Sequence, residues 1–416
     1  MPQLLHALSA QAEPDAAFAR FDEFVSSLPG GVQLFSLFRA NPRLLTLVAD
    51  LMGTAPRLAG HLSRNVSLFD AMLAPGFLEP IPNVEAFAGE LDRALARSDD
   101  VQDTLDAVRR FAHDREFQVG LHVLLGLIDG DAAAAILSGI AETVIRALLP
   151  RAEGWLAAQH GRVPGGRFVV FGLGKLGSRE LAIGSDLDLI FVYDAPENAR
   201  SDGSRPLPAS TWYARLGQRL VSALTAKTPE GNLYEIDTRL RPSGHLGPVA
   251  CSIENFRRYQ LGTAQTWEHQ ALTRARLVAG DPALGARVDE VVARALAIRR
   301  DPATLGQEVG AMRERIFREH GDDDPWNLKH AQGGLIEAEF LAQYLQLRLL
   351  PDHPSMRTVS TEQAFLQAAE VGALRAADAR LLVDAVRLYR RLQAVLRLSV
   401  QDRFTPDSAP GGLRRA

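Results

Sequence analysis

One stretch of the sequence decides the fold: Gly174-Lys175-Leu176-Gly177-Ser178-Arg179-Glu180-Leu181-Ala182-Ile183-Gly184-Ser185-Asp186-Leu187-Asp188-Leu189-Ile190. It follows a β-branched and aromatic run at 167–171, which predicts a buried strand. The stretch continues as a glycine turn and a short helical segment, and then enters a second predicted strand, 187–193, through Asp-x-Asp. Strand, turn and strand in this order predict a small α/β unit.

Two carboxylates mark the start of the second strand. Side chains on a strand alternate faces, so Asp186 and Asp188 point the same way, about 7 Å apart. That arrangement is costly without a cation, and Mg²⁺ is the usual one, held by carboxylates and substrate phosphates. Asp237 lies in a third predicted strand, 233–240, where an acid is a poor sheet former. If the two strands are neighbours, Asp237 completes a three-carboxylate cluster that could clamp a phosphoryl displacement, with Glu235 as the fallback ligand.

Residues around this cluster are candidates for binding a nucleotide. The six candidates are Lys175, Gly177, Ser178, Ser185, Arg239 and Arg241. Gly177 and Ser178 are expected at the mouth of a helix, where backbone N–H groups and the positive helix end bind phosphates. The two arginines follow the third acid and would either meet a triphosphate tail or hold the end of the sheet.

The same glycines also match a dinucleotide-binding pattern. Gly172, Gly174 and Gly177 follow a strand as Gly-x-Gly-x-x-Gly, and Asp194 lies near the position of a ribose-binding acid. Parallel strands need a crossover of a dozen or more residues, however, and only nine separate Gly177 from the next strand. We therefore reject this alternative, which also leaves the three acids unexplained.

Other residues of the kinds found in metal or nucleophile sites lack the required spacing. The acidic run 322–324 is expected to be a solvated loop, and Trp267-Glu268-His269 to serve packing or hydrogen bonding. No Gly-x-Ser-x-Gly elbow is present. The only cysteine, Cys251, cannot form an internal disulfide, which fits a reducing cytosol.

The composition is that of a soluble globular protein, with 46% apolar and 23% charged residues. A formal net charge of −4 shows no basic footprint for gripping nucleic acid. The N-terminus lacks the pattern of a secretory signal. The most apolar long stretch, 121–149, is interrupted by charges, so we expect no membrane-spanning helix and a cytoplasmic location.

The chain as a whole is predicted to be mainly α, with a small α/β core containing a short mixed sheet between two helical segments. Leucines and alanines recur at helical spacing before the core, and leucine-rich helices return after 281–282 and continue to Arg403. Pro42, Gly53, Pro56, Gly60 and the run 74–76 are expected to divide the first segment into short helices. We expect domains at 1–115, 116–285 and 286–416.

Several longer motifs resemble the glutamine synthetase adenylyltransferases (glutamate–ammonia-ligase adenylyltransferases), a branch of the nucleotidyltransferase superfamily. They are Asn-Pro-Arg-Leu-Leu at 41–45, Phe-Gly-Leu-Gly-Lys-Leu-Gly-Ser-Arg-Glu-Leu at 171–181, Ser-Asp-Leu-Asp-Leu at 185–189, Tyr-Glu-Ile-Asp-Thr-Arg-Leu-Arg-Pro-Ser-Gly at 234–244, Thr-Trp-Glu-His-Gln-Ala-Leu-Thr-Arg-Ala-Arg at 266–276 and Gly-Gly-Leu-Ile-Glu-Ala-Glu-Phe at 333–340. The resemblance therefore extends over nearly the whole chain. Family members usually carry two homologous halves, one adenylylating a tyrosine of glutamine synthetase with ATP and the other removing the AMP by phosphorolysis. With a single Ser-Asp-Leu-Asp motif, this chain resembles one half, and its sequence at 267–276 is similar to that of the adenylylating C-terminal half.

The resemblance also implies roles for individual residues and partners. Asp186, Asp188 and Asp237 would hold Mg²⁺, and Gly177 and Ser178 would cradle the triphosphate of ATP. Glutamine synthetase and a PII-type nitrogen-signalling protein would be the partners. The phosphorolytic half, a same-fold enzyme with another acceptor and a catalytically silent regulatory module remain open as alternatives.

Overall fold

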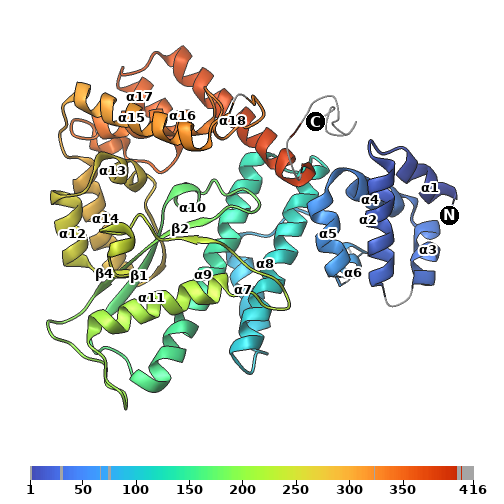
Figure 1. Cartoon of the computed structure of the whole chain (residues 1–416), viewed down its shortest axis with the longest axis horizontal. Helices are drawn as coiled ribbons and strands as arrows, with labels where there is room; N and C mark the ends of the chain where they lie inside the picture. Colours follow the sequence, from blue (N-terminus) through green and yellow to red (C-terminus); the bar gives the residue numbers. More distant parts are fainter. Residues whose placement is uncertain are drawn as a thin grey trace. The chain divides into compact units, whose positions relative to one another are not determined.

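The computed structural model describes residues 2–28, 31–65, 67–73, 76–322, 324–400 and 404. Contacts group the chain into two compact units, one made of 1–82, 113–133 and 390–416 and the other of 83–112 and 134–389 (Figure 1). The division into three domains at 115 and 285 stays a prediction.

Short helices make up the first part of the chain. They are α1 (Pro2–Ser9), α2 (Pro14–Ser27), α3 (Gly31–Ala40), α4 (Pro42–Thr54), α5 (Pro56–Arg64) and α6 (Ser67–Leu73). Pro42 and Pro56 begin α4 and α5, as expected of a residue that lacks an N–H to donate. The expectation that Gly53 and Gly60 would break helices is wrong, because both lie inside them. Residues 74 and 75 of the third expected break lie outside the described residues.

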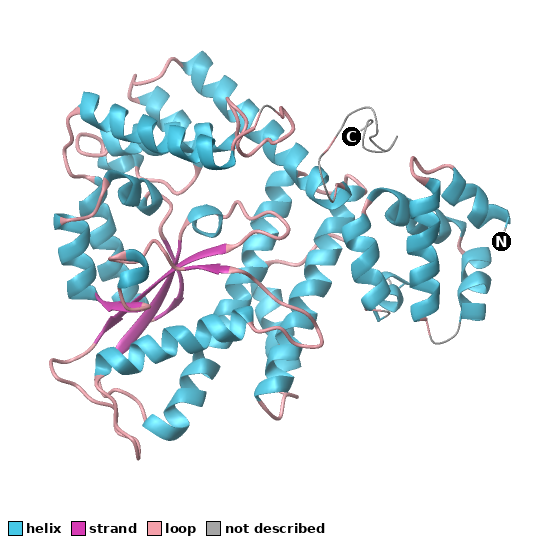
Figure 2. Cartoon of the chain, in the orientation of Figure 1, coloured by secondary structure: helices cyan, strands magenta, loops and turns pink. Residues whose placement is uncertain are grey.

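Further helices and a small sheet follow (Figure 2). They are α7 (Val84–Leu95), α8 (Val101–Leu124), α9 (Gly130–His160), α10 (Gly174–Ser178), α11 (Ala209–Thr225), α12 (Ile253–Gly262), α13 (Thr266–Leu272), α14 (Pro282–Leu296), α15 (Pro302–His320), α16 (Leu335–Leu349), α17 (Thr361–Glu370) and α18 (Ala376–Ser399), with 3₁₀ turns η1 (Gly244–Leu246) and η2 (Pro354–Met356). The return to helices after the core is confirmed, and α14 is capped by Asp281, whose Oδ1 accepts from the Leu284 N–H at 2.7 Å. Arg403 lies outside the described residues.

Helix α9 is long and apolar enough to cross a membrane by length and composition alone. Of its most apolar window, 72% is buried inside the molecule. Such burial is typical of the core helix of a soluble protein, which gives the same signal.

The sheet has five strands: β1 (Arg167–Gly172), β2 (Leu187–Asp194), β3 (Ile236–Asp237), β4 (Ala250–Ser252) and β5 (Arg276–Gly280). Strand β1 lies antiparallel to both β2 and β5, whereas β3 and β4 pair in parallel with β2. The sheet is therefore mixed, as predicted. The third strand was predicted too long, since only Ile236 and Asp237 pair, and β4 and β5 were not predicted.

Each face of the sheet packs against its own helices. Val169, Ile190 and Val192 share a buried cluster with residues of α12 and α14. On the other face, the rings of Phe168 and Tyr213 stack at 5.8 Å, which joins β1 to α11. Asp188 has the parity of Ile190 and Val192, so it lies on the α12 and α14 face at the strand's beginning.

Candidate active site

The pairing of β2 with β3 brings three carboxylates together. Asp188 lies directly opposite Asp237 in the parallel register, and Asp186 precedes the strand by one residue. One carboxylate oxygen from each acid lies within 4.8 Å of the other two. Glu235, the fallback ligand, is exposed and contributes its backbone carbonyl to Leu187 N at 2.9 Å. The trio expected from the sequence is thus assembled by the register of two short strands.

The three carboxylates of this cluster repel one another. Burial, together with Asp186 and Asp237, raises the pKa of Asp188 to about 7. Two unit charges 4.8 Å apart repel by about 3 kcal/mol at an effective dielectric constant of about 20. Three carboxylate donors at this spacing fit a hard divalent cation, because such an ion takes oxygen ligands and would neutralise the repulsion.

Gly174 adapts the glycine turn to this cluster. Its φ of +49° lies in the left-handed region, and a Cβ there would come within 2.1 Å of Asp188 Oδ2. The neighbouring Leu173 N–H donates to the Asp188 carbonyl at 2.9 Å. The backbone at the start of α10 therefore approaches the Asp188 carboxylate as closely as only glycine permits.

Gly177 and Ser178 lie at the end of α10, which corrects their expected place at the mouth of a helix. The Ser178 side chain is buried and its hydroxyl donates to the Gly174 carbonyl at 3.0 Å. A Cβ on Gly177 would lie 1.8 Å from the Arg274 carbonyl, so close packing also requires this glycine. Ser185 stabilises the next turn, its hydroxyl accepting from Ala182 N–H at 3.2 Å.

Two arginines of the motif at 266–276 hold α10 in place. Arg276 donates to the Leu176 carbonyl at 2.9 Å and to the Gly177 carbonyl at 3.0 Å, and it pairs with buried Glu142 of α9. These bonds satisfy carbonyls that a helix end leaves without intrahelical partners. Arg274 is buried and bridges Glu180, after α10, to Glu339 of α16 at 3.6 and 3.3 Å.

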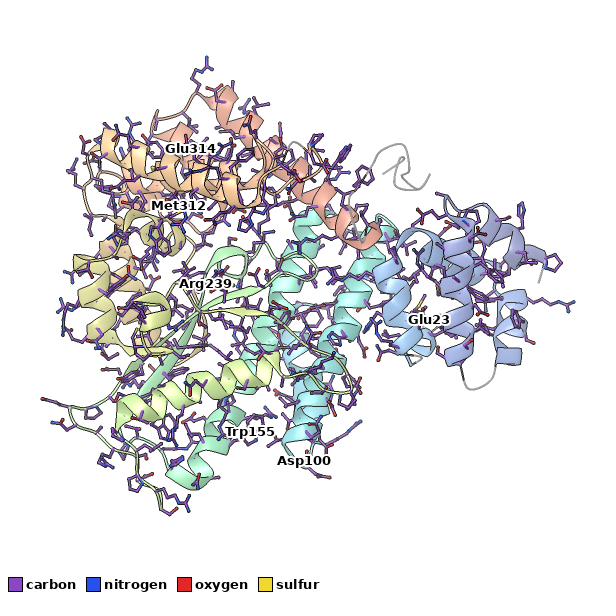
Figure 3. All side chains as sticks on the ribbon, viewed as in Figure 1. Glu23, Asp100, Trp155, Arg239, Met312 and Glu314 are labelled. Atoms are coloured by element: carbon purple, nitrogen blue, oxygen red, sulfur yellow. The ribbon has the colours of Figure 1, made fainter. Side chains whose placement is uncertain are left out.

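Cationic side chains surround the carboxylates. Arg239, labelled in Figure 3, donates through Nε to Asp237 Oδ2 at 2.7 Å, and its backbone N–H donates to Asp237 Oδ1 at 2.7 Å. Lys329 and Arg239 lower the pKa of Asp188, opposing the effect of burial and the other acids. Lys175 and Lys329 both lie close enough to His330 to help burial lower its pKa to about 4.

Sequence reasoning missed Lys329, which comes from the loop before α16. A compositional signal was available. The chain has 46 basic residues, of which only three are lysines, at 175, 227 and 329. One of the three, Lys329, lies near enough to Asp188 to lower its pKa, and a second, Lys175, directly follows Gly174, whose backbone approaches the Asp188 carboxylate.

Two roles were expected for Arg241, meeting a triphosphate tail or holding the end of the sheet. Its guanidinium is buried and donates to the Thr238 carbonyl at 2.7 Å and to the Gly247 carbonyl at 3.2 Å. Its contacts are therefore to the loop that follows β3.

The residues set aside by the sequence analysis have structural contacts. Glu268 accepts from the Tyr259 hydroxyl at 2.8 Å, and His269 lies 2.6 Å from Arg300, so hydrogen bonding at this motif is confirmed. Asp322 is exposed as expected, but Asp324 is buried and accepts from Trp326 N–H at 3.0 Å, which corrects the fully solvated loop. Residue 323 lies outside the described residues.

The geometry also excludes a dinucleotide fold. Strands β1 and β2 are antiparallel, whereas a dinucleotide-binding unit needs them parallel. Asp194 pairs with Arg287 of α14.

A cavity of about 590 Å³ lies at the other end of the sheet, lined by residues such as Phe168, Trp212 and Pro282, and does not include the carboxylates.

The sequence model of the glutamate-ammonia ligase adenylyltransferase family matches residues 45–291. This match covers more than half of the chain and includes all three carboxylates of the cluster. The chain belongs to the glutamate-ammonia ligase adenylyltransferase family. A second model, GlnD PII-uridylyltransferase, matches residues 309–405.

Curated relatives of this adenylyltransferase family align along the whole chain. The bifunctional glutamine synthetase adenylyltransferase/adenylyl-removing enzymes of Xanthobacter autotrophicus and Bradyrhizobium diazoefficiens are each 41% identical over 416 residues, covering 100% of this chain. The enzyme of the same name from Brucella suis is 42% identical over 417 residues and covers 99% of this chain. The chain spans 42% of the length of each of these relatives.

Proposed function

We propose that this chain is a nucleotidyltransferase that moves AMP from ATP to a tyrosine hydroxyl of glutamine synthetase, and so down-regulates that enzyme. The observation that carries the proposal is the register of β2 and β3, which sets Asp188 opposite Asp237 beside Asp186. Membership of the adenylyltransferase family and the names of the relatives support glutamine synthetase as the acceptor.

The reaction is a displacement at the α-phosphorus. The tyrosine oxygen forms a bond to that phosphorus, the bond to the β-phosphate oxygen breaks, pyrophosphate leaves, and the phenolic proton is released to solvent. Mg²⁺ held by Asp186, Asp188 and Asp237 would neutralise charge on the phosphates and the attacking oxygen. The protein itself contributes mainly by positioning the two reactants and by fixed charges, which need no reorganisation during the step.

The surrounding cations are suited to the triphosphate. Lys329 and Arg239 lower the pKa of Asp188, and Lys175 and Lys329 both act on the pKa of His330, so these three cations would be available to the phosphates. Gly177 and Ser178 belong to α10 and Ser185 to the turn at 182–185, the two segments that lead into the Asp186–Asp188 part of the cluster. Arg241 acts on the nucleotide indirectly, by fixing the segment that carries Arg239.

Two further features belong to the same proposal. The match of residues 309–405 to the GlnD PII-uridylyltransferase model supports a PII-type signalling protein as a regulatory partner. The motif at 266–276 supports the adenylylating rather than the phosphorolytic half, acting in the cytoplasm.

The test is incubation with α-labelled ATP, Mg²⁺ and glutamine synthetase. We expect label on a synthetase tyrosine with the wild-type chain and with Asp194→Asn, a control on the same strand outside the cluster, and none with Asp188→Asn. Transfer by Asp188→Asn at the wild-type rate would contradict the metal site. Release of ADP from adenylylated synthetase and phosphate, without forward transfer, would instead identify the phosphorolytic half.

A further inference from the structure

A buried arginine joins segments of the chain that are far apart in the sequence. Arg274, between α13 and β5, is 4% exposed and lies in the compact unit that contains the sheet. Its guanidinium donates to the Thr361 hydroxyl at 2.7 Å and pairs with Glu180 at 3.6 Å and with Glu339 at 3.3 Å. Glu180 follows α10, Glu339 belongs to α16 and Thr361 begins α17 (Figure 1). One side chain therefore ties the segment after α10 to two helices from the C-terminal part of the chain.

The segment that Arg274 holds is continuous with the backbone that approaches Asp188. The N–H of Glu180 donates to the Lys175 carbonyl at 2.7 Å, at the end of α10. Lys175 directly follows Gly174, where a Cβ would come within 2.1 Å of Asp188 Oδ2. One hydrogen bond and one residue thus separate Glu180 from the backbone beside this carboxylate, so a displacement of Glu180 would be transmitted to it.

The main chain and the charge of Arg274 also reach this site. A Cβ on Gly177 would lie 1.8 Å from the Arg274 carbonyl, so the two backbones pack without room for a side chain. Burial lowers the pKa of Arg274, but nearby carboxylates, including that of Asp188, outweigh this effect and raise the pKa. The guanidinium is therefore close enough to Asp188 to interact with its charge.

A buried guanidinium with several partners is better suited to fixing an arrangement than to adding stability. Taking its charge and two carboxylates out of water is costly, and their attraction offsets that cost without a large surplus. The planar fork of arginine holds donors in fixed directions, whereas the ammonium of lysine is a single point of charge. Because the partners of Arg274 come from three different segments, the fork sets the positions of those segments relative to one another.

We propose that Arg274 is a positioning residue for AMP transfer, through which the placement of α16 and α17 sets the geometry of the carboxylate site. The inference rests on the proposed function and deepens it, because it makes these helices a required part of the catalytic unit. Both helices lie within residues 309–405, the segment that matches the GlnD PII-uridylyltransferase model. A shift of the helices relative to Glu180 would therefore alter catalysis without any contact to the nucleotide.

The test compares three substitutions at this junction with a matched control. Thr361→Val removes only the hydroxyl that accepts from Arg274, Arg274→Lys keeps the charge without the fork, and Arg274→Met removes both. The control is Arg357→Met, since Arg357 pairs with Asp289 of α14 rather than with a residue next to α10. Each variant is measured for Mn²⁺ affinity by electron paramagnetic resonance, for kcat and KM for ATP in AMP transfer, and for the midpoint of urea unfolding.

The expected results separate positioning from stability. Both Arg274 variants should lower kcat about 10- to 100-fold and weaken Mn²⁺ binding about tenfold, the loss typical of residues that orient metal ligands. Arg274→Lys should regain part of the urea midpoint that Arg274→Met loses, but not its kcat. Thr361→Val should lower kcat and Mn²⁺ affinity about three- to tenfold, as expected for one lost hydrogen bond, with a near-normal urea midpoint. Arg357→Met should match the wild type in kcat and Mn²⁺ affinity.

Two results would overturn the inference. Wild-type kcat and Mn²⁺ affinity in Thr361→Val would show that α17 has no bearing on the carboxylate site, and this variant decides the matter even if Arg274→Met fails to fold. Recovery of kcat in Arg274→Lys in parallel with its stability would make the role of Arg274 purely structural. If the wild-type chain transfers no AMP to glutamine synthetase, the proposed function fails, whereas the Mn²⁺ affinity of Thr361→Val still decides whether the helices act on the site.

Discussion

Replacing Asp188 with asparagine should stabilise the protein while removing its activity. Burial and two neighbouring carboxylates raise the pKa of Asp188 from its ordinary 3.8 to about 7. A difference of this size corresponds to about 4 kcal/mol between the two protonation states. The ionised carboxylate therefore opposes folding when no cation is bound, and a neutral isostere removes that cost.

The sign of the effect gives it a definite pH dependence. The folded state holds the Asp188 proton more tightly than the unfolded state does, so this group lowers stability as pH rises from about 4 to about 7. We expect Asp188→Asn to raise the free energy of unfolding by about 2 to 4 kcal/mol at pH 8 and by only about 1 kcal/mol at pH 5. AMP transfer should fall more than about 100-fold.

Urea unfolding in EDTA, followed by tryptophan fluorescence, measures this directly. All four tryptophans, at 155, 212, 267 and 326, belong to the compact unit that contains the sheet, so the signal reports on that unit. Asp194→Asn, which removes the partner of Arg287 on the same strand, should be slightly destabilising. The electrostatic reasoning would be refuted if Asp188→Asn were no more stable than the wild type at pH 8. It would also be refuted if the substitution changed the free energy of unfolding equally at pH 5 and pH 8.

Three further perturbations test the parts around the cluster. Gly174→Ala places a Cβ 2.1 Å from Asp188 Oδ2 at a positive φ, so turnover should fall about 10- to 100-fold and the free energy of unfolding by about 1 to 3 kcal/mol. Normal steady-state kinetics would contradict the close approach. Lys329→Ala should raise KM for ATP about tenfold with a smaller change in kcat, while Lys227→Ala serves as the control; equal KM values in both would remove Lys329 from the site. Arg276→Met leaves the buried Glu142 paired only with Arg146 and Arg179, at 3.3 and 3.5 Å, and removes the donor to the α10 carbonyls. Urea unfolding should show that the free energy of unfolding falls by about 3 kcal/mol. An unchanged free energy of unfolding would mean that these bonds add little to stability.

Local patterns in the sequence predicted the centre of the fold well. The β-branched and aromatic runs predicted to be strands were found as β1 and β2. The Asp-x-Asp spacing predicted that Asp186 and Asp188 share one face of a strand. Asp237 was identified because an acid, a poor sheet former, stood inside a predicted strand. These features depend on residues close in sequence, so one window of the chain contains the signal.

Features that depend on distant contacts were not predictable in the same way. Strand β4 has three residues and β5 begins inside the motif at 266–276, so neither shows an independent alternating pattern. Gly177 looked like a phosphate-binding glycine, but its close neighbour is the Arg274 carbonyl, almost 100 residues away. Lys329 is far from Asp188 in the sequence, and only the folded chain brings it close enough to lower the Asp188 pKa. Each of these features follows from tertiary packing, which a single sequence does not display.

The most direct test of the central claim, that three carboxylates form one divalent-cation site for nucleotidyl transfer, is a crystal structure with Mn²⁺ and a non-hydrolysable ATP analogue. Anomalous scattering should show Mn²⁺ bound by Asp186, Asp188 and Asp237, with the triphosphate reaching toward Lys175 and Lys329. Mn²⁺ and analogue bound elsewhere in the chain, with no anomalous peak among these carboxylates, would contradict the account.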